Sequence, residues 1–166
     1  MAFQISTELD PALVGLAWMI GRWQGSGSGV EPDGQPFDYG LTIDFAETGR
    51  AWLHYLMQWF EADAAGQPIR PLGLETGFWR PQPDGQVEVV IAQPEGVAEI
   101  YIGQIDGAKI ELRTDLVVRT DTAEVATSGG HRLYGNVESD LMFAYDRGTD
   151  QSDLQPYLWA RLKRVE

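Results

Sequence analysis

The chain has 166 residues, no cysteine, and 25 acidic against 12 basic side chains, which gives a formal net charge of −13 at pH 7. This length suits one domain with its own core, so we expect a single domain over residues 1–166. The acidic excess predicts repulsion from nucleic acid and from anionic membranes. The lack of cysteine excludes disulfides, thiolate metal sites and a cysteine nucleophile, and it fits a reducing, cytoplasmic location.

The first expected element is a short helix. Asp10 and Pro11 are typical of an N-cap and a first helical position, and Gly21 is typical of a helix end, so the sequence predicts a helix over residues 11–20. The apolar run at residues 13–20 is too short to span a bilayer. Acidic residues precede it where a signal peptide carries positive charge, so we expect no targeting segment.

Alternation of apolar and polar residues dominates the rest of the chain and indicates strands. The clearest run covers residues 37–45. Similar runs are found at residues 22–30, 51–61, 74–80, 87–93, 98–104, 109–115, 120–127, 132–138, 140–145 and 156–165. Asp84-Gly85, Asp106-Gly107 and Gly129-Gly130 are typical of hairpin turns, and prolines at residues 81–83 break the strand before them.

About ten short strands joined mainly by tight turns describe a meander. Such a meander normally closes on itself, because closure leaves no unpaired strand edge. We therefore predict an all-β fold, an antiparallel up-and-down barrel of the lipocalin or fatty-acid-binding-protein type, with the short N-terminal helix capping one end.

The most distinctive local motif is G-x-W-x-G-x-G, formed by Gly21, Trp23, Gly25 and Gly27, with Gly29 following. Strand alternation places Trp23 and the last three glycines on one face. Either the missing side chains leave space for a ligand above a tryptophan plug, or the glycines permit a strong bend at a barrel corner. No helix follows and the P-loop lysine is absent, so the motif is not a phosphate loop. We expect these residues to line the interior: Trp23, Phe37, Tyr39, Leu41 and Phe45.

Over residues 9–165 the chain resembles the nitrobindin family. The resemblance rests on the G-x-W-x-G-x-G motif, on Glu75-Thr76-Gly77-Phe78-Trp79-Arg80-Pro81, on residues 87–96, and on the closing Leu154-Gln155-Pro156-Tyr157-Leu158, all in the family's order. It implies a ten-stranded barrel similar to the fatty-acid-binding proteins, with ferric haem b held at its mouth by one histidine. It further implies reversible binding of nitric oxide and isomerisation of peroxynitrite to nitrate.

Two positions depart from the family's pattern. The resemblance places the haem-ligating histidine at Tyr157, which is a metal ligand only if haem is bound. A tyrosinate can ligate ferric haem, but an ordinary phenol ionises near pH 10 and needs a neighbouring base or cation; Arg161 and Lys163 are near in sequence. Asp33 stands where the family often has a threonine, and it adds negative charge near the cofactor. Strand alternation points Leu158 inward and the adjacent Tyr157 outward. Tyr157 therefore reaches the pocket only if the strand is irregular near its proline.

Other candidate residues carry weaker signals. We interpret His54 and His131 as wall residues rather than metal ligands. Arg80 and Arg119 are either cavity cations for a ligand carboxylate or surface residues at strand ends. The many carboxylates fit strands and turns that face water, so no catalytic residue is assigned.

The sequence therefore predicts a nitrobindin-like binding protein with a cavity for a small apolar ligand or a weakly held haem. The residues expected at the pocket are Tyr157, Asp33, Gly29, Phe37 and Tyr39. One alternative is a haem-dependent peroxynitrite isomerase and nitric-oxide-binding protein in which Tyr157 or another group replaces the histidine. Another is a filled barrel that serves as an interaction module without a ligand. A homodimer is compatible with each interpretation.

Overall fold

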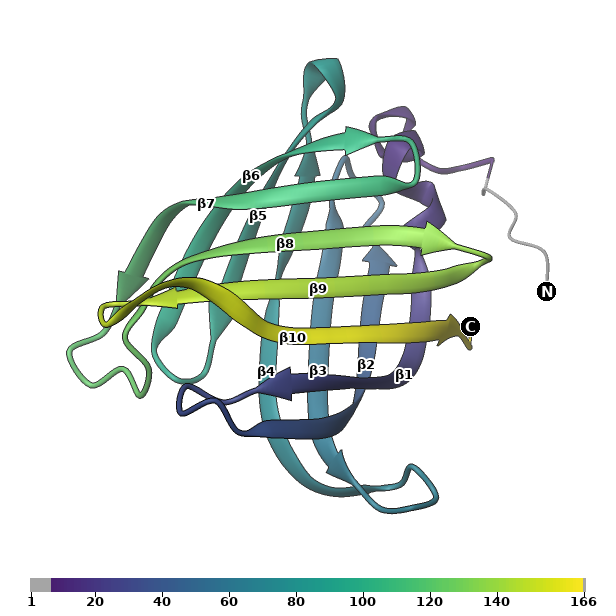
Figure 1. Ribbon diagram of the computed structural model, residues 1–166. Coiled ribbons are helices and arrows are strands. Elements are labelled where there is room, and N and C mark those ends of the chain that lie inside the picture. The colour runs from purple at the N-terminus through teal and green to yellow at the C-terminus, as the bar shows by residue number, and fades with distance from the viewer. Residues whose placement is uncertain (1–6, 166) are drawn as a thin grey trace.

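The computed structural model describes residues 7–165, which form a closed barrel of ten antiparallel strands (Figure 1). The strands are β1 (Gly21–Val30), β2 (Pro36–Glu47), β3 (Leu53–Ala62), β4 (Pro68–Pro81), β5 (Gln86–Gln93), β6 (Val97–Asp106), β7 (Lys109–Arg119), β8 (Thr127–Val137), β9 (Asp140–Thr149) and β10 (Ser152–Arg164). Each strand pairs with the next along the chain, and β1 pairs with β10 to close the barrel. The predicted up-and-down barrel is confirmed.

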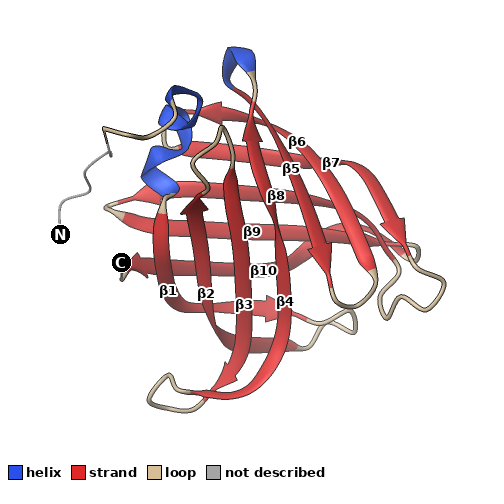
Figure 2. Ribbon diagram, turned by 180° about the vertical axis from the view of Figure 1, so that it is seen from behind, coloured by secondary structure: helices blue, strands red, loops and turns tan. Residues whose placement is uncertain are grey.

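A short 3₁₀ helix, η1 (Pro11–Met19), lies at the end of the barrel where β1 begins (Figure 2). Asp10 caps it as predicted, because its carboxylate accepts a hydrogen bond from the Ala12 N–H at 2.9 Å. The helix buries Leu13 and Leu16 against the barrel. A second 3₁₀ turn, η2 (Pro83–Gly85), joins β4 to β5. No helix in the described residues is long and apolar enough to cross a membrane.

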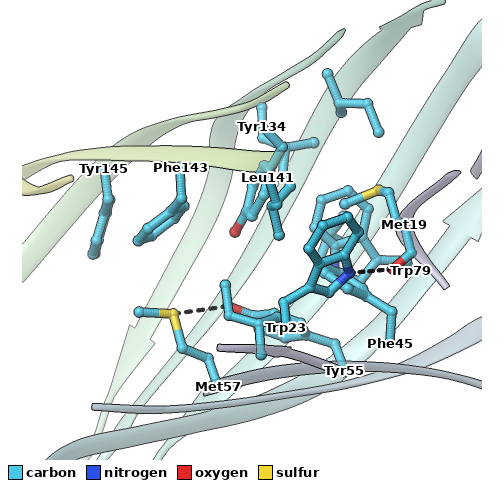
Figure 3. Close-up of a cluster of buried hydrophobic side chains, with 14 of the residues drawn as sticks. Met19, Trp23, Phe45, Tyr55, Met57, Trp79, Tyr134, Leu141, Phe143 and Tyr145 are labelled. Atoms are coloured by element: carbon cyan, nitrogen blue, oxygen red, sulfur yellow. Dashed lines mark hydrogen bonds between the residues drawn. The ribbon is translucent and has the colours of Figure 1, made fainter. Parts of the chain in front are cut away.

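The predicted interior is confirmed by the strand register. Trp23, Tyr39, Leu41 and Phe45 are at most 2% exposed, and Phe37 is half-buried. The residues between them on β2 lie on the outer face, as the two-residue period of a strand requires. Figure 3 shows the aromatic centre of this core, in which the Phe45 and Trp79 rings meet edge to face at 5.5 Å.

Two details of the predicted strand pattern are wrong. Residues 120–127 are mainly a loop between β7 and β8, because their backbone bonds to the β5–β6 turn instead of a neighbouring strand: the Glu124 N–H donates to the Glu95 carbonyl at 3.0 Å. Gly129-Gly130 is not a turn but part of β8. A Cβ at Gly130 would lie 2.4 Å from the Tyr101 hydroxyl, so this glycine makes room for an interior ring.

The glycines of the G-x-W-x-G-x-G motif permit close approach of strands. A Cβ at Gly25 would lie 2.1 Å from the Arg161 carbonyl oxygen of β10, and a Cβ at Gly27 would lie 2.1 Å from the Trp159 carbonyl oxygen. The close strand approach at these positions supports the bent-corner interpretation. Gly25 and Gly27 also line a cavity of about 1060 Å³ with Tyr39 and Phe143, so their role as ligand space stays a prediction.

Gly25→Ala is expected to lower the free energy of unfolding by about 1–3 kcal/mol, because the added methyl group would force β1 away from β10. Urea unfolding followed by tryptophan fluorescence measures this change. Gly129→Ala is the control: a Cβ there meets no atom within 4 Å and the backbone is not left-handed. Equal stability of the two variants would contradict the assigned role of Gly25.

Candidate functional site

The end of the barrel opposite η1, which we call the mouth, contains Tyr157. Strand β10 is irregular there: its register with β9 shifts between Ser152 and Gln155 and again between Pro156 and Leu158. Proline cannot donate a ladder hydrogen bond, which fits such a break. Tyr157 is the unpaired residue, and its half-buried side chain packs against the interior cluster. The condition for Tyr157 to reach the interior is thus met.

Two neighbours hold the Tyr157 ring. The guanidinium carbon of Arg147 lies 3.7 Å from the ring centroid, and the Tyr145 ring meets it edge to face at 5.6 Å. Burial raises the pKa of the Tyr157 phenol; Arg147 lowers it in part, and Glu31 raises it further. The phenol therefore stays protonated at neutral pH.

Arg161 and Lys163, which are near Tyr157 in sequence, lie elsewhere in the structure. The Arg161 Nε donates to an Asp140 carboxylate oxygen at 2.6 Å, and the Lys163 Nζ donates to the other oxygen at 3.3 Å, near the start of β9. Both residues are on the outer face of β10, because the residues between and beside them point inward. The cation beside Tyr157 is Arg147, which comes from β9.

A pocket of about 250 Å³ opens at the mouth beside Tyr157 and Arg147. Its acidic member is Glu31. Asp33 is not among the residues that line it; Asp33 is exposed in the β1–β2 turn and accepts a hydrogen bond from the Gln35 N–H at 3.0 Å. The expectation that Asp33 lines the ligand pocket is therefore wrong for the mouth as the structure shows it.

The structure brings three of the other expected pocket residues together. A Cβ at Gly29 would lie 2.4 Å from the Phe37 ring and 2.7 Å from the Tyr157 carbonyl oxygen. The Phe37 and Tyr39 rings are 5.9 Å apart. The Tyr39 hydroxyl donates to the Trp159 carbonyl at 3.1 Å, which fixes that ring across the β1–β10 seam. Aromatic surface therefore faces the interior next to Tyr157.

A buried charged network lies deeper in the barrel, and sequence reasoning missed it. The Arg132 guanidinium, fully buried, forms an ion pair with Glu75 through both terminal nitrogens. The Gln93 amide donates to Glu75 at 3.1 Å and to Glu99 at 2.9 Å. The Tyr101 hydroxyl donates to Glu99 at 2.5 Å. The sequence signal that could have revealed this network is strand alternation, because each charged residue lies on the same face of its strand as inward aromatic residues.

The pKa values of the two buried carboxyls are shifted in opposite directions. Burial opposes ionisation of Glu75, but the Arg132 guanidinium and the hydrogen bonds from Arg132, Tyr55 and Gln93 outweigh it and hold its pKa below the usual value. Burial dominates at Glu99, so its pKa is raised despite Arg132. Glu75 therefore pairs with Arg132 as a carboxylate, whereas burial disfavours the charged form of Glu99.

Stacked rings connect the network to the mouth. The Arg132 guanidinium carbon lies 4.0 Å from the Tyr145 ring centroid and 5.0 Å from that of Tyr101. Tyr145 in turn contacts Tyr157, which lies under Arg147. Two contacting rings, Tyr145 and Tyr157, thus lie between the cation at the centre of the barrel and the cation at its mouth.

The remaining candidate residues are structural. His54 bonds to the Thr76 hydroxyl at 2.9 Å, and His131 bonds to Glu111 at 2.8 Å, on the outer wall. No group of three or more His, Asp or Glu side chains within residues 7–165 is arranged to hold a metal ion. Arg80 and Arg119 form exposed ion pairs with acidic neighbours at 2.8 and 2.9 Å, so the surface interpretation of both is confirmed.

Fold and site together define a closed antiparallel binding barrel with an aromatic mouth. Residues 12–164 match the family model described as the THAP4-like, heme-binding beta-barrel domain. A "Ferric nitrobindin-like protein" of Cutibacterium acnes is 53% identical over 99% of both chains, and a "Peroxynitrite isomerase" of Nocardioides sp. is 43% identical over 99% of both. The crystal structure of Rv2717c from M. tuberculosis superposes with a TM-score of 0.83 at 33% identity, covering 95% of this chain and 99% of that one. The chain belongs to the nitrobindin family of haem-binding β-barrels.

Proposed function

We propose that this chain is a nitrobindin-family binding protein in which Tyr157 replaces the haem-ligating histidine, and that it binds a small apolar ligand without ligating haem iron. The observation that carries this proposal is the state of Tyr157. Its phenol is half-buried, lies under Arg147 and has a raised pKa. An iron ligand at this position would need the phenol to ionise, which this environment opposes.

The pocket beside Tyr157 and Arg147 measures about 250 Å³, and a second cavity of about 1060 Å³ is lined by Tyr39 and Phe143 among others. Cavity volume does not distinguish haem from a smaller ligand, so the proposal rests on Tyr157. The chain's own residues offer ring faces from Phe37 and Tyr39 to an apolar ligand, a neutral hydroxyl at Tyr157 that can donate one hydrogen bond, and the Arg147 cation beside it.

A haem-dependent peroxynitrite isomerase is the rival function. The name of the 43% identical Nocardioides relative supports it. The two functions differ in a measurable way, because an isomerase of this type needs stoichiometric haem and accelerates peroxynitrite decay, whereas the proposed binding protein does neither.

Tyr157→His is expected to raise haemin affinity at least about tenfold over the unmodified protein at pH 7, because neutral imidazole ligates iron without the cost of ionising a phenol. Absorbance titration with haemin measures the affinity. Tyr157→Phe is the matched control and should leave it unchanged. Adding Asp33→Thr should add nothing, since Asp33 is exposed away from the pocket. Equal affinity of the histidine and phenylalanine variants would show that position 157 does not face the haem-binding region.

A further inference from the structure

Two charges of opposite sign line the pocket of about 250 Å³ beside Tyr157, which we call the mouth pocket. Arg147 comes from β9, and Glu31 directly follows β1. Strand β10 lies between β9 and β1 and pairs with both. The β1–β2 turn and the β9–β10 turn lie at the same end of the barrel (Figure 1). The two charged residues are therefore about two strand spacings apart, each of about 4.8 Å, with the pocket between them.

Neither charge has a partner of opposite sign within residues 7–165. The Arg147 guanidinium forms no ion pair there and lies 3.7 Å from the centroid of the Tyr157 ring, and the Glu31 carboxylate accepts no hydrogen bond from these residues. Other arginines of this acidic chain do pair: Arg80 and Arg119 lie 2.8 and 2.9 Å from carboxylate oxygens. Arg147 is half-buried, so its charge is partly removed from water without a compensating carboxylate. A ligand with charges of both signs would supply what each group lacks.

We propose that the mouth pocket binds a free α-amino acid with an apolar side chain, held by Arg147 and Glu31. This assignment rests on the proposed function, because it names the ligand class of the same site. The arginine fork matches the geometry of a carboxylate, and the Glu31 carboxylate can accept hydrogen bonds from an ammonium group. Both ionised groups of an α-amino acid are bonded to one carbon atom, so a single small molecule reaches both residues. A longer peptide carries these charges at opposite ends.

The rest of the mouth pocket favours an apolar side chain on this ligand. Val30, Pro32 and Pro156 line it together with the Tyr157 ring. The lining holds no charge besides Arg147 and Glu31, so a third charge on the ligand would find no partner there. The volume corresponds to roughly eight water molecules at about 30 Å³ each, which suits a ligand of the size of leucine or phenylalanine.

The test is isothermal titration calorimetry of the full chain with L-phenylalanine and with two derivatives that each lack one charge. We expect L-phenylalanine to saturate at one molecule per chain. N-acetyl-L-phenylalanine lacks the ammonium group and L-phenylalaninamide lacks the carboxylate. Each derivative should bind at least about tenfold more weakly, because it loses charge-assisted hydrogen bonds.

Two variants assign the charges to their partners. Glu31→Gln should weaken binding of L-phenylalanine at least about tenfold and remove its advantage over the N-acetyl derivative. Arg147→Gln should remove the advantage over the amide. Asp33→Asn is the matched control, because Asp33 lies in the same turn as Glu31 but does not line the pocket, and it should bind like the unmodified protein. If Arg147→Gln does not fold, Glu31→Gln decides, since Glu31 is exposed.

Three results would overturn the assignment. One is no saturable binding of L-phenylalanine or L-leucine by the unmodified protein. Another is equal affinity for L-phenylalanine and its two derivatives. The third is an equal loss of affinity in Glu31→Gln and Asp33→Asn. Each of these leaves the proposed function standing as long as haemin is not ligated, whereas saturable haemin ligation through Tyr157 would overturn the proposed function whatever the amino acid result.

Discussion

Arg132→Met is expected to lower the free energy of unfolding by about 3–5 kcal/mol, the usual cost of removing one partner of a buried ion pair. Methionine fills much of the same volume, but Glu75 would lose the cation that keeps it ionised in a fully buried position. The tyrosine rings stacked on the guanidinium would lose their contacts as well. Urea unfolding at pH 7 measures the change.

The matched control is Arg80→Met, which removes an ion pair whose arginine is about half exposed and which should cost at most about 1 kcal/mol. The two buried carboxyls give a second comparison. Glu75→Gln should destabilise clearly, because it removes the charge that pairs with Arg132. Glu99→Gln should destabilise less, because burial disfavours the charged form of Glu99 and the substitution removes that cost. Equal losses from the two glutamine variants would refute the assigned charges.

The two carboxyls also have opposite pH dependence. The folded-state pKa of Glu75 is lowered, so its contribution is present above its unfolded pKa and is lost as the pH falls through the folded value. The folded-state pKa of Glu99 is raised, so its contribution is full below the unfolded pKa and is lost as the pH rises through the folded value. Glu75→Gln should therefore weaken the loss of stability in acid, and Glu99→Gln the loss above the ordinary titration range of glutamate.

Trp23→Ala is expected to cost about 3–5 kcal/mol, the range for deleting a large buried aromatic side chain. Trp23 is fully buried, its indole N–H donates to the Met19 carbonyl at 2.7 Å, and the Arg164 guanidinium carbon lies 4.1 Å from its ring centroid. It therefore joins η1 to the end of β10, and its bond to Met19 is drawn in Figure 3. Thermal and urea unfolding measure the loss. A cost below about 1 kcal/mol would mean that the helix end of the barrel does not depend on this ring.

Much of the barrel was predictable because its strands follow the two-residue period. The interior face of β2 and the turn at Asp84-Gly85, where both residues have positive φ, were read directly from the sequence. The loop at residues 120–127 could not be predicted, because its apolar alternation is typical of a strand while its backbone bonds to the β5–β6 turn. Gly129-Gly130 has the composition of a turn, yet it lies within β8, where Gly130 makes room for rings from β6 and β9.

Features of the site could be predicted only where they depend on the sequence of a single strand. The irregularity at Pro156 followed from proline chemistry, and it brings Tyr157 to the interior. The partners of Tyr157 come from β9 and from the β1–β2 turn, and no local pattern pairs Arg147 or Glu31 with it. The Arg132–Glu75 pair likewise joins β8 to β4. Strand alternation could predict that each side chain points inward, but not that the two side chains pair. Long-range pairing across a closed barrel is what the sequence left open.

The most direct test of the proposed function is the absorbance spectrum of the unmodified protein during titration with haemin at pH 7. If Tyr157 stays a neutral phenol under Arg147, no saturable Soret change will develop at one haemin per chain, and peroxynitrite will decay no faster with protein and haemin together than with haemin alone. A Soret band that saturates at one haemin per chain, and that Tyr157→Phe abolishes, would contradict the account and show that Tyr157 ligates the iron.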